Sequence, residues 1–346
     1  MQQSLFLRNF MFLDVLSLSD NTVRLCRVYG EEPIISFPDT LSAPDGVPLI
    51  ITELGDYCFS ENARGLPAPE QLLRYEVTED GSSRFCAEKA ELHPICGNFL
   101  EELSLPETLQ VIGNCAFYNC RKLRRLSFGA GELRVGSDVF LNCFVLETLL
   151  IRATPETPTG LFALVNSITE AVEAIYQPKD AAAPVAGLWY PAYWEDIEET
   201  PAHILLHTFS GQGYHYRQCF LDKKFLPAEY DAIFPQGHDA DDANIMAMLC
   251  FDRLRWPWQL SETARAAYRE FVAANTGRIL TRLLKAQDLE GIQALLALDV
   301  MTPEAFAEGA ALAAKADNAS AAALLADAEY RKHAAQPKKK RYDFDF

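Results

Sequence analysis

The sequence predicts an α+β chain in which a short β-solenoid precedes a mixed segment and an all-α helical repeat array. Three observations support this class. A 23-residue period runs through the first half, a proline-marked stretch follows it, and an Ala- and Leu-rich second half places apolar residues at helical spacing. We therefore expect four regions: a solenoid over 20–155, a connecting segment over 156–235, a helical domain over 236–333 and a disordered basic tail over 334–346.

The period relates many positions in one register. Each unit opens with two leucines, and a third apolar residue lies two positions after the second leucine. The second leucine and this third residue point to one face of a short strand. A single unit cannot bury its own apolar face, so at least ~3 coils must stack. The recurring positions are Leu100, Leu103, Gly113, Phe117, Asn119, Leu123, Leu126, Gly136, Phe140, Asn142, Leu146 and Leu149.

Each recurring residue type has an expected structural role. The glycines suit a tight bend, where a Cβ would clash or where positive φ is needed. Phe117 and Phe140 should fill the space between coils. Asn119 and Asn142 should hydrogen-bond backbone groups of the following turn. The cysteine after each asparagine should pack as a small apolar residue, with a disulfide between the two as the alternative.

An earlier copy of the unit, Leu54–Phe59, matches Ile112–Phe117, so Glu61–Phe99 holds an insertion, with a strand-like part around Tyr75. These residues resemble BspA-type leucine-rich repeats. The G-x-x-A-F-x-N-C-x-x-L-x-x-L run of Gly113–Leu126 is similar to that family's repeat unit, and the segment from Tyr29 to Phe59 to its opening unit. The resemblance implies a leucine-rich β-solenoid with a binding role. Many family members are surface or secreted proteins of host-associated bacteria and protists.

The connecting segment begins with an apolar stretch, Leu161–Tyr176, which we expect to be helical. It then carries the densest group of potentially chemical side chains in the chain. As a partner-binding patch these would act as an interface hot spot, and the alternative is core packing between solenoid and helices. The candidate binding residues are Trp189, Tyr190, Trp194, His203, His207, Tyr214, His215 and Arg217.

The histidines of this group also allow an enzymatic interpretation. His203 and His207 are spaced by one helical turn, so on a helix their rings would share a face and could bind a metal. No Glu follows the first histidine, so the zincin pattern is absent, and the intervening Ile-Leu-Leu also suits a strand. A metal-dependent or hydrolytic site around His203, His207 and His215 therefore stays an alternative. We assign no catalytic residue, metal or cofactor.

The last third has helical spacing. Apolar residues recur over Ala243–Leu254, and Ser261 is a plausible N-cap for a helix over Glu262–Ala274. Asp288 and Asp317 occupy corresponding positions in two related Ala- and Leu-rich stretches. These paired short helices resemble ankyrin-like repeats, although the T-P-L-H run of that family is absent.

Composition restricts partners and compartment. The 48 acidic and 31 basic residues give a net charge of −17, which disfavours general nucleic-acid binding. No apolar stretch is long enough for membrane insertion, and no signal peptide is recognised. The nine cysteines form no C-x-x-C pair, so we expect free thiols in the cytoplasm. The predicted function is a non-enzymatic repeat protein that mediates protein–protein interaction, and a cell-surface adhesin is a further alternative.

Overall fold

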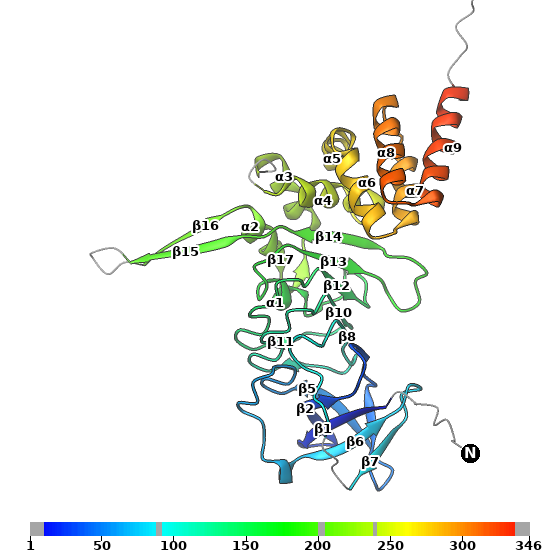
Figure 1. Ribbon diagram of the computed structural model, residues 1–346. Coiled ribbons are helices and arrows are strands. Elements are labelled where there is room, and N and C mark those ends of the chain that lie inside the picture. The colour runs from blue at the N-terminus through cyan, green and yellow to red at the C-terminus, as the bar shows by residue number, and fades with distance from the viewer. Residues whose placement is uncertain (1–9, 88–91, 200–204, 238–240, 336–346) are drawn as a thin grey trace, which may run out of the picture. The chain divides into compact units, whose positions relative to one another are not determined.

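The computed structural model describes residues 10–87, 92–199, 205–237 and 241–335. The chain divides into two compact units, residues 1–241 and 242–346, which Figure 1 shows in blue to light green and in olive to red. The first unit contains a β-solenoid and the second is helical, so the predicted fold class is confirmed. Two expectations, the site at His203 and the basic tail after residue 335, lie outside the described residues.

One sheet of the first unit is a ladder of short strands, one from each coil. Leu103, Leu126 and Leu149 are directly paired neighbours, which confirms the period found in the sequence. The strands before the last are parallel, and the last closes the ladder by antiparallel pairing. In spatial order they are β3 (Ile34–Ser36), β8 (Glu102–Ser104), β10 (Arg125–Phe128), β12 (Thr148–Ile151), β13 (Val172–Tyr176) and β14 (Ala186–Tyr190).

The other sheet combines coil strands with an antiparallel end. Its coil strands pair in parallel, and they are β2 (Thr22–Tyr29), β5 (Pro48–Leu54), β9 (Val111–Ile112) and β11 (Arg134–Val135). Antiparallel strands extend it beyond β2 and along β5, and they are β1 (Met11–Ser17), β6 (Leu73–Val77), β7 (Ser83–Cys86) and β4 (Thr40–Ser42). The strand expected around Tyr75 is β6, which follows a short 3₁₀ turn over Pro69–Gln71.

Buried phenylalanine rings stack from one coil to the next, as expected. Phe59 stacks on Phe117 and Phe117 on Phe140, each pair with ring centroids 5.3 Å apart and interplanar angles of 13° and 5°. The Cys120 thiol donates to the Phe59 carbonyl at 3.3 Å, and the Cys143 thiol to the Phe117 carbonyl at 3.0 Å. All nine cysteines are free thiols, so the two coils are joined by packing and not by a disulfide.

The repeated glycines are required by close approach of the coils. A Cβ on Gly113 would lie 2.6 Å from the Asp56 backbone nitrogen, and one on Gly136 would lie 2.7 Å from that of Asn114. Neither glycine has positive φ. The left-handed conformation falls two positions later, at Cys115 with φ 52°. Of the two reasons expected for these glycines, steric clash is the one that applies.

The repeated asparagines bond each other and not the backbone of the following turn, which differs from the expectation. Asn142 Nδ2 donates to Asn119 Oδ1 at 2.7 Å. Both residues have left-handed backbones, with φ of 67° and 65°, a conformation that asparagine tolerates better than most residues. A second ladder uses other side chains: the Asn114 amide donates to Asp56 Oδ1 at 2.7 Å, and the Ser137 amide to Asn114 Oδ1 at 2.9 Å.

The expected helix over Leu161–Tyr176 is wrong beyond its first turn. Helix α1 spans Leu161–Val165, and strand β13 follows from Val172. Val172, Ala174 and Tyr176 are buried while the residues between them are less so, which is the period of a strand. Pairing with β12 on one side and β14 on the other fixes this strand conformation.

The rest of the first unit consists of a hairpin arm and small elements after it. The arm contains strands β15 (Trp194–Glu199) and β16 (Leu205–Ser210), which pair only with each other among the described residues. After it come α2 (Gly213–Arg217), β17 (Phe220–Leu221), β18 (Lys224–Phe225) and α3 (Pro227–Gly237). The arm leaves the stack of coils, and Figure 1 shows it as a two-stranded ribbon.

The second unit is a series of helices: α4 (Ala243–Arg255), α5 (Glu262–Ala274), α6 (Thr276–Lys285), α7 (Leu289–Ala297), α8 (Pro303–Lys315) and α9 (Ala319–Ala335). The predicted N-cap is confirmed, because Ser261 Oγ accepts from the Ala264 amide at 3.2 Å. No helix in the described part of the chain is both long and apolar enough to cross a membrane.

Two helical pairs repeat within this unit, but in a register that differs from the sequence match. Asp288 and Asn318 both cap a helix, and the residues before them, Gln287 and Asp317, both have left-handed backbones. The sequence match pairs Asp288 with Asp317, whereas the residue that caps the second helix as Asp288 caps the first is Asn318. The likeness to ankyrin repeats stays a prediction.

Candidate functional site

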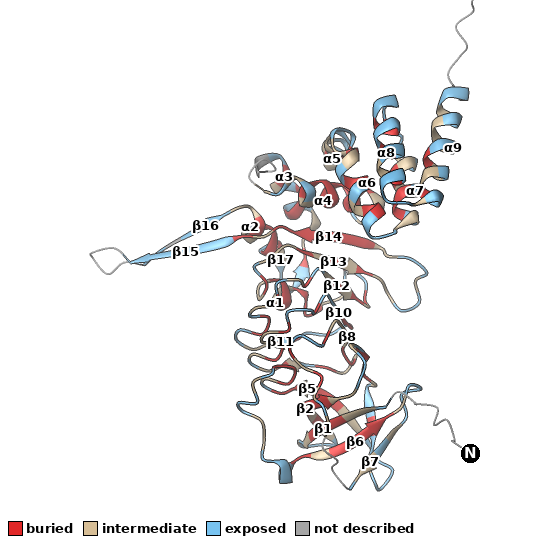
Figure 2. Cartoon of the chain, viewed as in Figure 1, coloured by how far each residue is buried: buried red, intermediate tan, exposed pale blue. Residues whose placement is uncertain are grey.

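The arm is exposed along both of its strands. Its two strands pair in register from Trp194 opposite Ser210 to Glu199 opposite Leu205. Every residue of β15 is exposed, as are the described side chains of β16, and Figure 2 shows the arm in the colour of exposed residues. An isolated two-stranded ribbon has no core of its own and is marginally stable in water. The arm is thus a surface available to another molecule.

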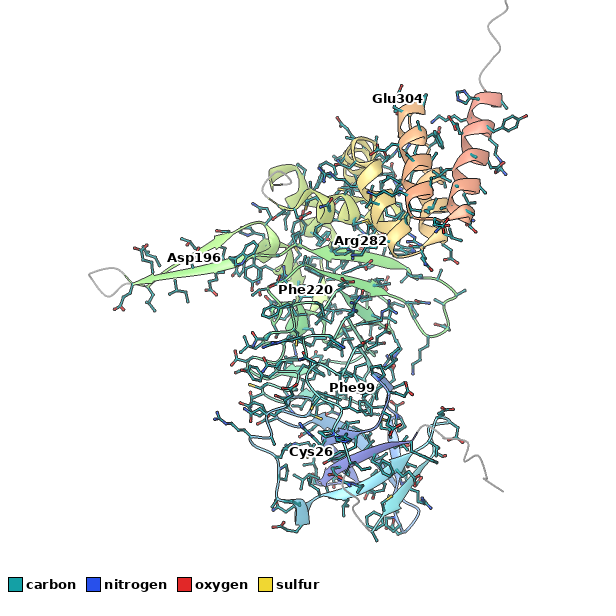
Figure 3. The ribbon with its side chains drawn as sticks, in the orientation of Figure 1. Cys26, Phe99, Asp196, Phe220, Arg282 and Glu304 are labelled. Atoms are coloured by element: carbon teal, nitrogen blue, oxygen red, sulfur yellow. The ribbon has the colours of Figure 1, made fainter. Side chains whose placement is uncertain are left out.

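Both faces of the arm combine apolar and acidic side chains. Residues opposite one another in an antiparallel pair share a face, and the faces alternate along each strand. One face carries Trp194, Asp196, Glu198, Leu206, Thr208 and Ser210, and the other carries Glu195, Ile197, Glu199, Leu205 and Phe209. Trp194 is 66% exposed, Ile197 58% and Leu206 47%. Figure 3 shows the side chains that line both strands, with Asp196 labelled.

An aromatic cluster fixes the base of the arm. The rings of Phe209 and Tyr214 stack with centroids 3.8 Å apart at an interplanar angle of 11°, and Tyr193 lies 5.9 Å from Tyr214. The chain turns sharply between them: Gly211 has φ of 85°, and a Cβ on Gly213 would clash with the Pro191 carbonyl oxygen. The strands therefore leave the solenoid from a packed and sterically restricted position.

Arg217 joins this base to the last coil. Its side chain is completely buried, and its guanidinium lies 4.9 Å from the centre of the Tyr193 ring. Burial lowers the pKa of Arg217 to about 10. Its hydrogen-bond acceptors are all backbone carbonyls, those of Val165, Ile168, Glu170, Pro191 and Gly213. A single side chain thus bridges α1, the loop before β13, the end of β14 and the start of α2.

The structure places the sequence-predicted residues in different environments. Trp189 and Tyr190 are buried in β14, and Tyr230 Oη both donates to the Trp189 carbonyl at 2.6 Å and accepts from its amide at 2.9 Å. Trp194 is on the arm, while Tyr214 and His215 lie on α2, half-buried and exposed respectively. Residues 205–210 form a strand that includes His207, so this residue does not lie on the helix that the metal-binding alternative assumed.

Sequence reasoning missed Ile197 and Leu206 as exposed arm residues. Ile197 stands within an acidic run, and the leucine within an apolar run, which favours a buried strand. The register pairs the two runs with each other, and no other described strand pairs with either of them. An acidic run followed closely by an apolar run is a signal that could have indicated a projecting hairpin.

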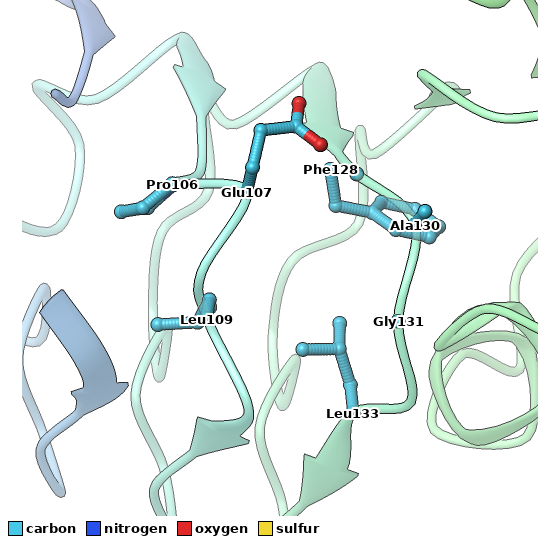
Figure 4. Close-up of a pocket in the computed structure, with 8 residues that line it drawn as sticks. Pro106, Glu107, Leu109, Phe128, Ala130, Gly131 and Leu133 are labelled. Atoms are coloured by element: carbon cyan, nitrogen blue, oxygen red, sulfur yellow. The ribbon is translucent and has the colours of Figure 1, made fainter. Parts of the chain in front are cut away.

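Two small hollows occur on the first unit. Figure 4 shows one of them, which is lined by Glu107, Phe128 and Leu133 and has a cavity volume of about 0 Å³. The other lies near Arg24 and Asp56 and has a cavity volume of about 40 Å³. Both fall below the ~300–1,000 Å³ of small-molecule sites. Within the described ranges, no three His, Cys, Asp or Glu side chains are grouped to hold a metal ion.

A comparison with protein families supports the repeat. Residues 96–172 match the model of the BspA type leucine rich repeat region. This segment covers the ladder from before β8 to the start of β13, under a quarter of the chain. No curated protein and no solved structure matches the chain.

Proposed function

We propose that this chain is a non-enzymatic repeat protein that mediates protein–protein interaction, with the arm as its main contact surface. The observation that carries the proposal is the exposure of Trp194, Ile197 and Leu206 on a ribbon that projects from the coils. Large apolar side chains on a protein surface mark interaction sites when they gather on one element. Tryptophan is enriched among residues that dominate binding energy.

The base of the arm supports the same proposal. Binding by a flexible segment loses free energy to ordering, whereas a surface held in place before binding avoids that loss. The stacked rings of Phe209 and Tyr214 and the contacts of Arg217 hold the base of the arm. The solenoid then acts as the rigid support from which the arm is presented.

The test compares the proteins that three purified chains retain from a lysate of the source cell. The first is the intact chain, and the second carries Trp194→Ser, Ile197→Ser and Leu206→Ser. The third is a matched control with Leu221→Ser, Phe144→Ser and Tyr330→Ser, at residues that are 63%, 60% and 73% exposed.

The expected result is a partner protein that binds the intact chain and the control, and binds the arm variant at least ~30-fold more weakly when both proteins are purified. Equal affinity for all three chains would refute the role of the arm. Circular dichroism of each variant checks that the fold is retained.

The enzymatic alternative has its own test. Stoichiometric zinc or manganese in the purified chain, lost in the double variant His203→Ala/His207→Ala, would contradict a binding-only function. His215 is exposed on α2, so it is accessible to a metal or substrate.

We also propose a cytoplasmic location, which nine free cysteines support because oxidising compartments favour disulfides. Protease treatment of intact cells distinguishes this from a surface adhesin, since an internal protein survives it.

A further inference from the structure

The outer edge of β15 is open to strand pairing. Among the described residues β15 pairs only with β16, so one side of its backbone has no strand partner. Exposed edges of this kind accept an additional strand through backbone hydrogen bonds, and alternate side chains give specificity. The six residues of β15 offer about 20 Å of edge at ~3.3 Å per residue.

The charge of β15 restricts what can pair with this edge. Four of its six residues are acidic, and they divide equally between the two faces: Glu195 and Glu199 on one, Asp196 and Glu198 on the other. The described residues of the arm, 194–199 and 205–210, include no lysine or arginine. The side chains of an incoming strand alternate between the two faces, so those on the face of Asp196 and Glu198 meet two carboxylates.

This charge excludes several occupants. A second copy of the chain would bring the same four carboxylates and a net charge of −17, and like charges across a pair of strands are destabilising. Nucleic acids and anionic lipid surfaces are repelled for the same reason. A basic protein segment has the opposite sign on the side chains that would face these acids.

We infer that the free edge of β15 binds an extended basic segment of a partner protein as a third strand. The segment alternates lysine or arginine with apolar residues. Its cations lie beside Asp196 and Glu198 on one face of β15, and its apolar side chains contact Ile197 on the other face. This inference rests on the proposed function, because it names the partner chemistry for the same arm.

The experiment uses the full chain and a defined peptide. The probe is an acetylated, amidated octapeptide of alternating lysine and valine carrying a fluorescent label, and its affinity is measured by fluorescence anisotropy. One control peptide has glutamate in place of lysine. A second has proline in place of the two central valines, because proline cannot donate a backbone hydrogen bond.

The matched protein variants separate local charge from total charge. The arm variant carries Glu195→Gln, Asp196→Asn, Glu198→Gln and Glu199→Gln. The control carries the same loss of four charges at exposed positions elsewhere, Glu31→Gln, Glu32→Gln, Glu79→Gln and Glu147→Gln. Amide hydrogen exchange of the intact chain, with and without peptide, identifies the segment that becomes protected.

The expected result is binding of the lysine peptide that weakens about tenfold in the arm variant and not in the control. The glutamate and proline peptides should bind the intact chain at least about tenfold more weakly than the lysine peptide does. In the complex with the lysine peptide, the amides of β15 should exchange more slowly than in the free chain. Equal binding to both variants, equal binding of the proline peptide, protection elsewhere or no binding would each overturn the inference. A cellular partner lost with the apolar arm variant would still support the proposed function, so the two failures are distinguishable.

Discussion

Replacement of Arg217 by methionine should destabilise the first unit by about 4 kcal/mol. The guanidinium donates to five buried or half-buried carbonyls, and a bond from a charged donor contributes at least ~1.5 kcal/mol, or ~7 in all. Burial of the charge opposes this. The fall of its pKa from 12.5 to about 10 corresponds to ~3 kcal/mol. Arg217→Met keeps the apolar stem but leaves the carbonyls without their donor.

The assay is urea denaturation followed by amide exchange of β13 and β14, which reports on this unit alone. Arg217→Lys keeps the charge with fewer donors and should lose roughly half as much stability. Arg121→Met removes an exposed arginine and should change stability by no more than ~0.5 kcal/mol. If Arg217→Met loses as little as Arg121→Met, the carbonyl contacts do not hold the arm's base, and the reasoning is wrong.

Three further predictions concern the coils. Gly136→Ala should cost ~1–3 kcal/mol in thermal or urea unfolding, because its Cβ would lie 2.7 Å from the Asn114 nitrogen, and an unchanged midpoint would contradict the close approach. Asn142→Ala should cost ~1–2 kcal/mol and Asn142→Gly less, since glycine restores the left-handed φ of 67°, and equal losses would exclude a backbone contribution. Burial raises the pKa of Cys143 from 9.0 to about 12, so this thiol ionises at a lower pH in the unfolded chain than in the folded chain. The contribution of the protonated thiol to the free energy of unfolding is complete below pH 9, and it should fall by ~1.4 kcal/mol per pH unit between pH 9 and pH 12. Cys143→Ala should show a smaller loss between pH 9 and 10 in urea titrations with reductant, and an equal loss would refute this origin.

The repeat was predictable because its contacts depend on the spacing of single residues. Phe117, Phe140 and their leucines recur with one period, and any stack with that period places them in contact. The same reasoning failed at Leu161–Tyr176, where composition favoured a helix. The alternating burial of Val172, Ala174 and Tyr176 follows from pairing with β12, which belongs to the preceding coil.

The candidate site was predictable only in part, because its parts act through different kinds of contact. Trp194 was identified from its aromatic character, and its exposure depends on the strand pairing. Arg217 was grouped with possible binding residues, but its acceptors are backbone carbonyls, which have no sequence signature. The acidity of β15 is evident in the sequence, whereas its open edge is a property of the topology.

The coil over residues 113–135 contacts the coils before and after it through equivalent groups, so such a chain can change in length by whole coils. The Cys115 amide bonds the Ser137 carbonyl just as the Tyr57 amide bonds the Asn114 carbonyl. A duplicated copy of this coil would therefore find every partner it needs in its two neighbours. Each duplication would elongate the stack by about 4.8 Å and leave both capping ends unchanged. The distance between the amino-terminal sheet and the arm is thus adjustable in evolution, and by design, in steps of one strand.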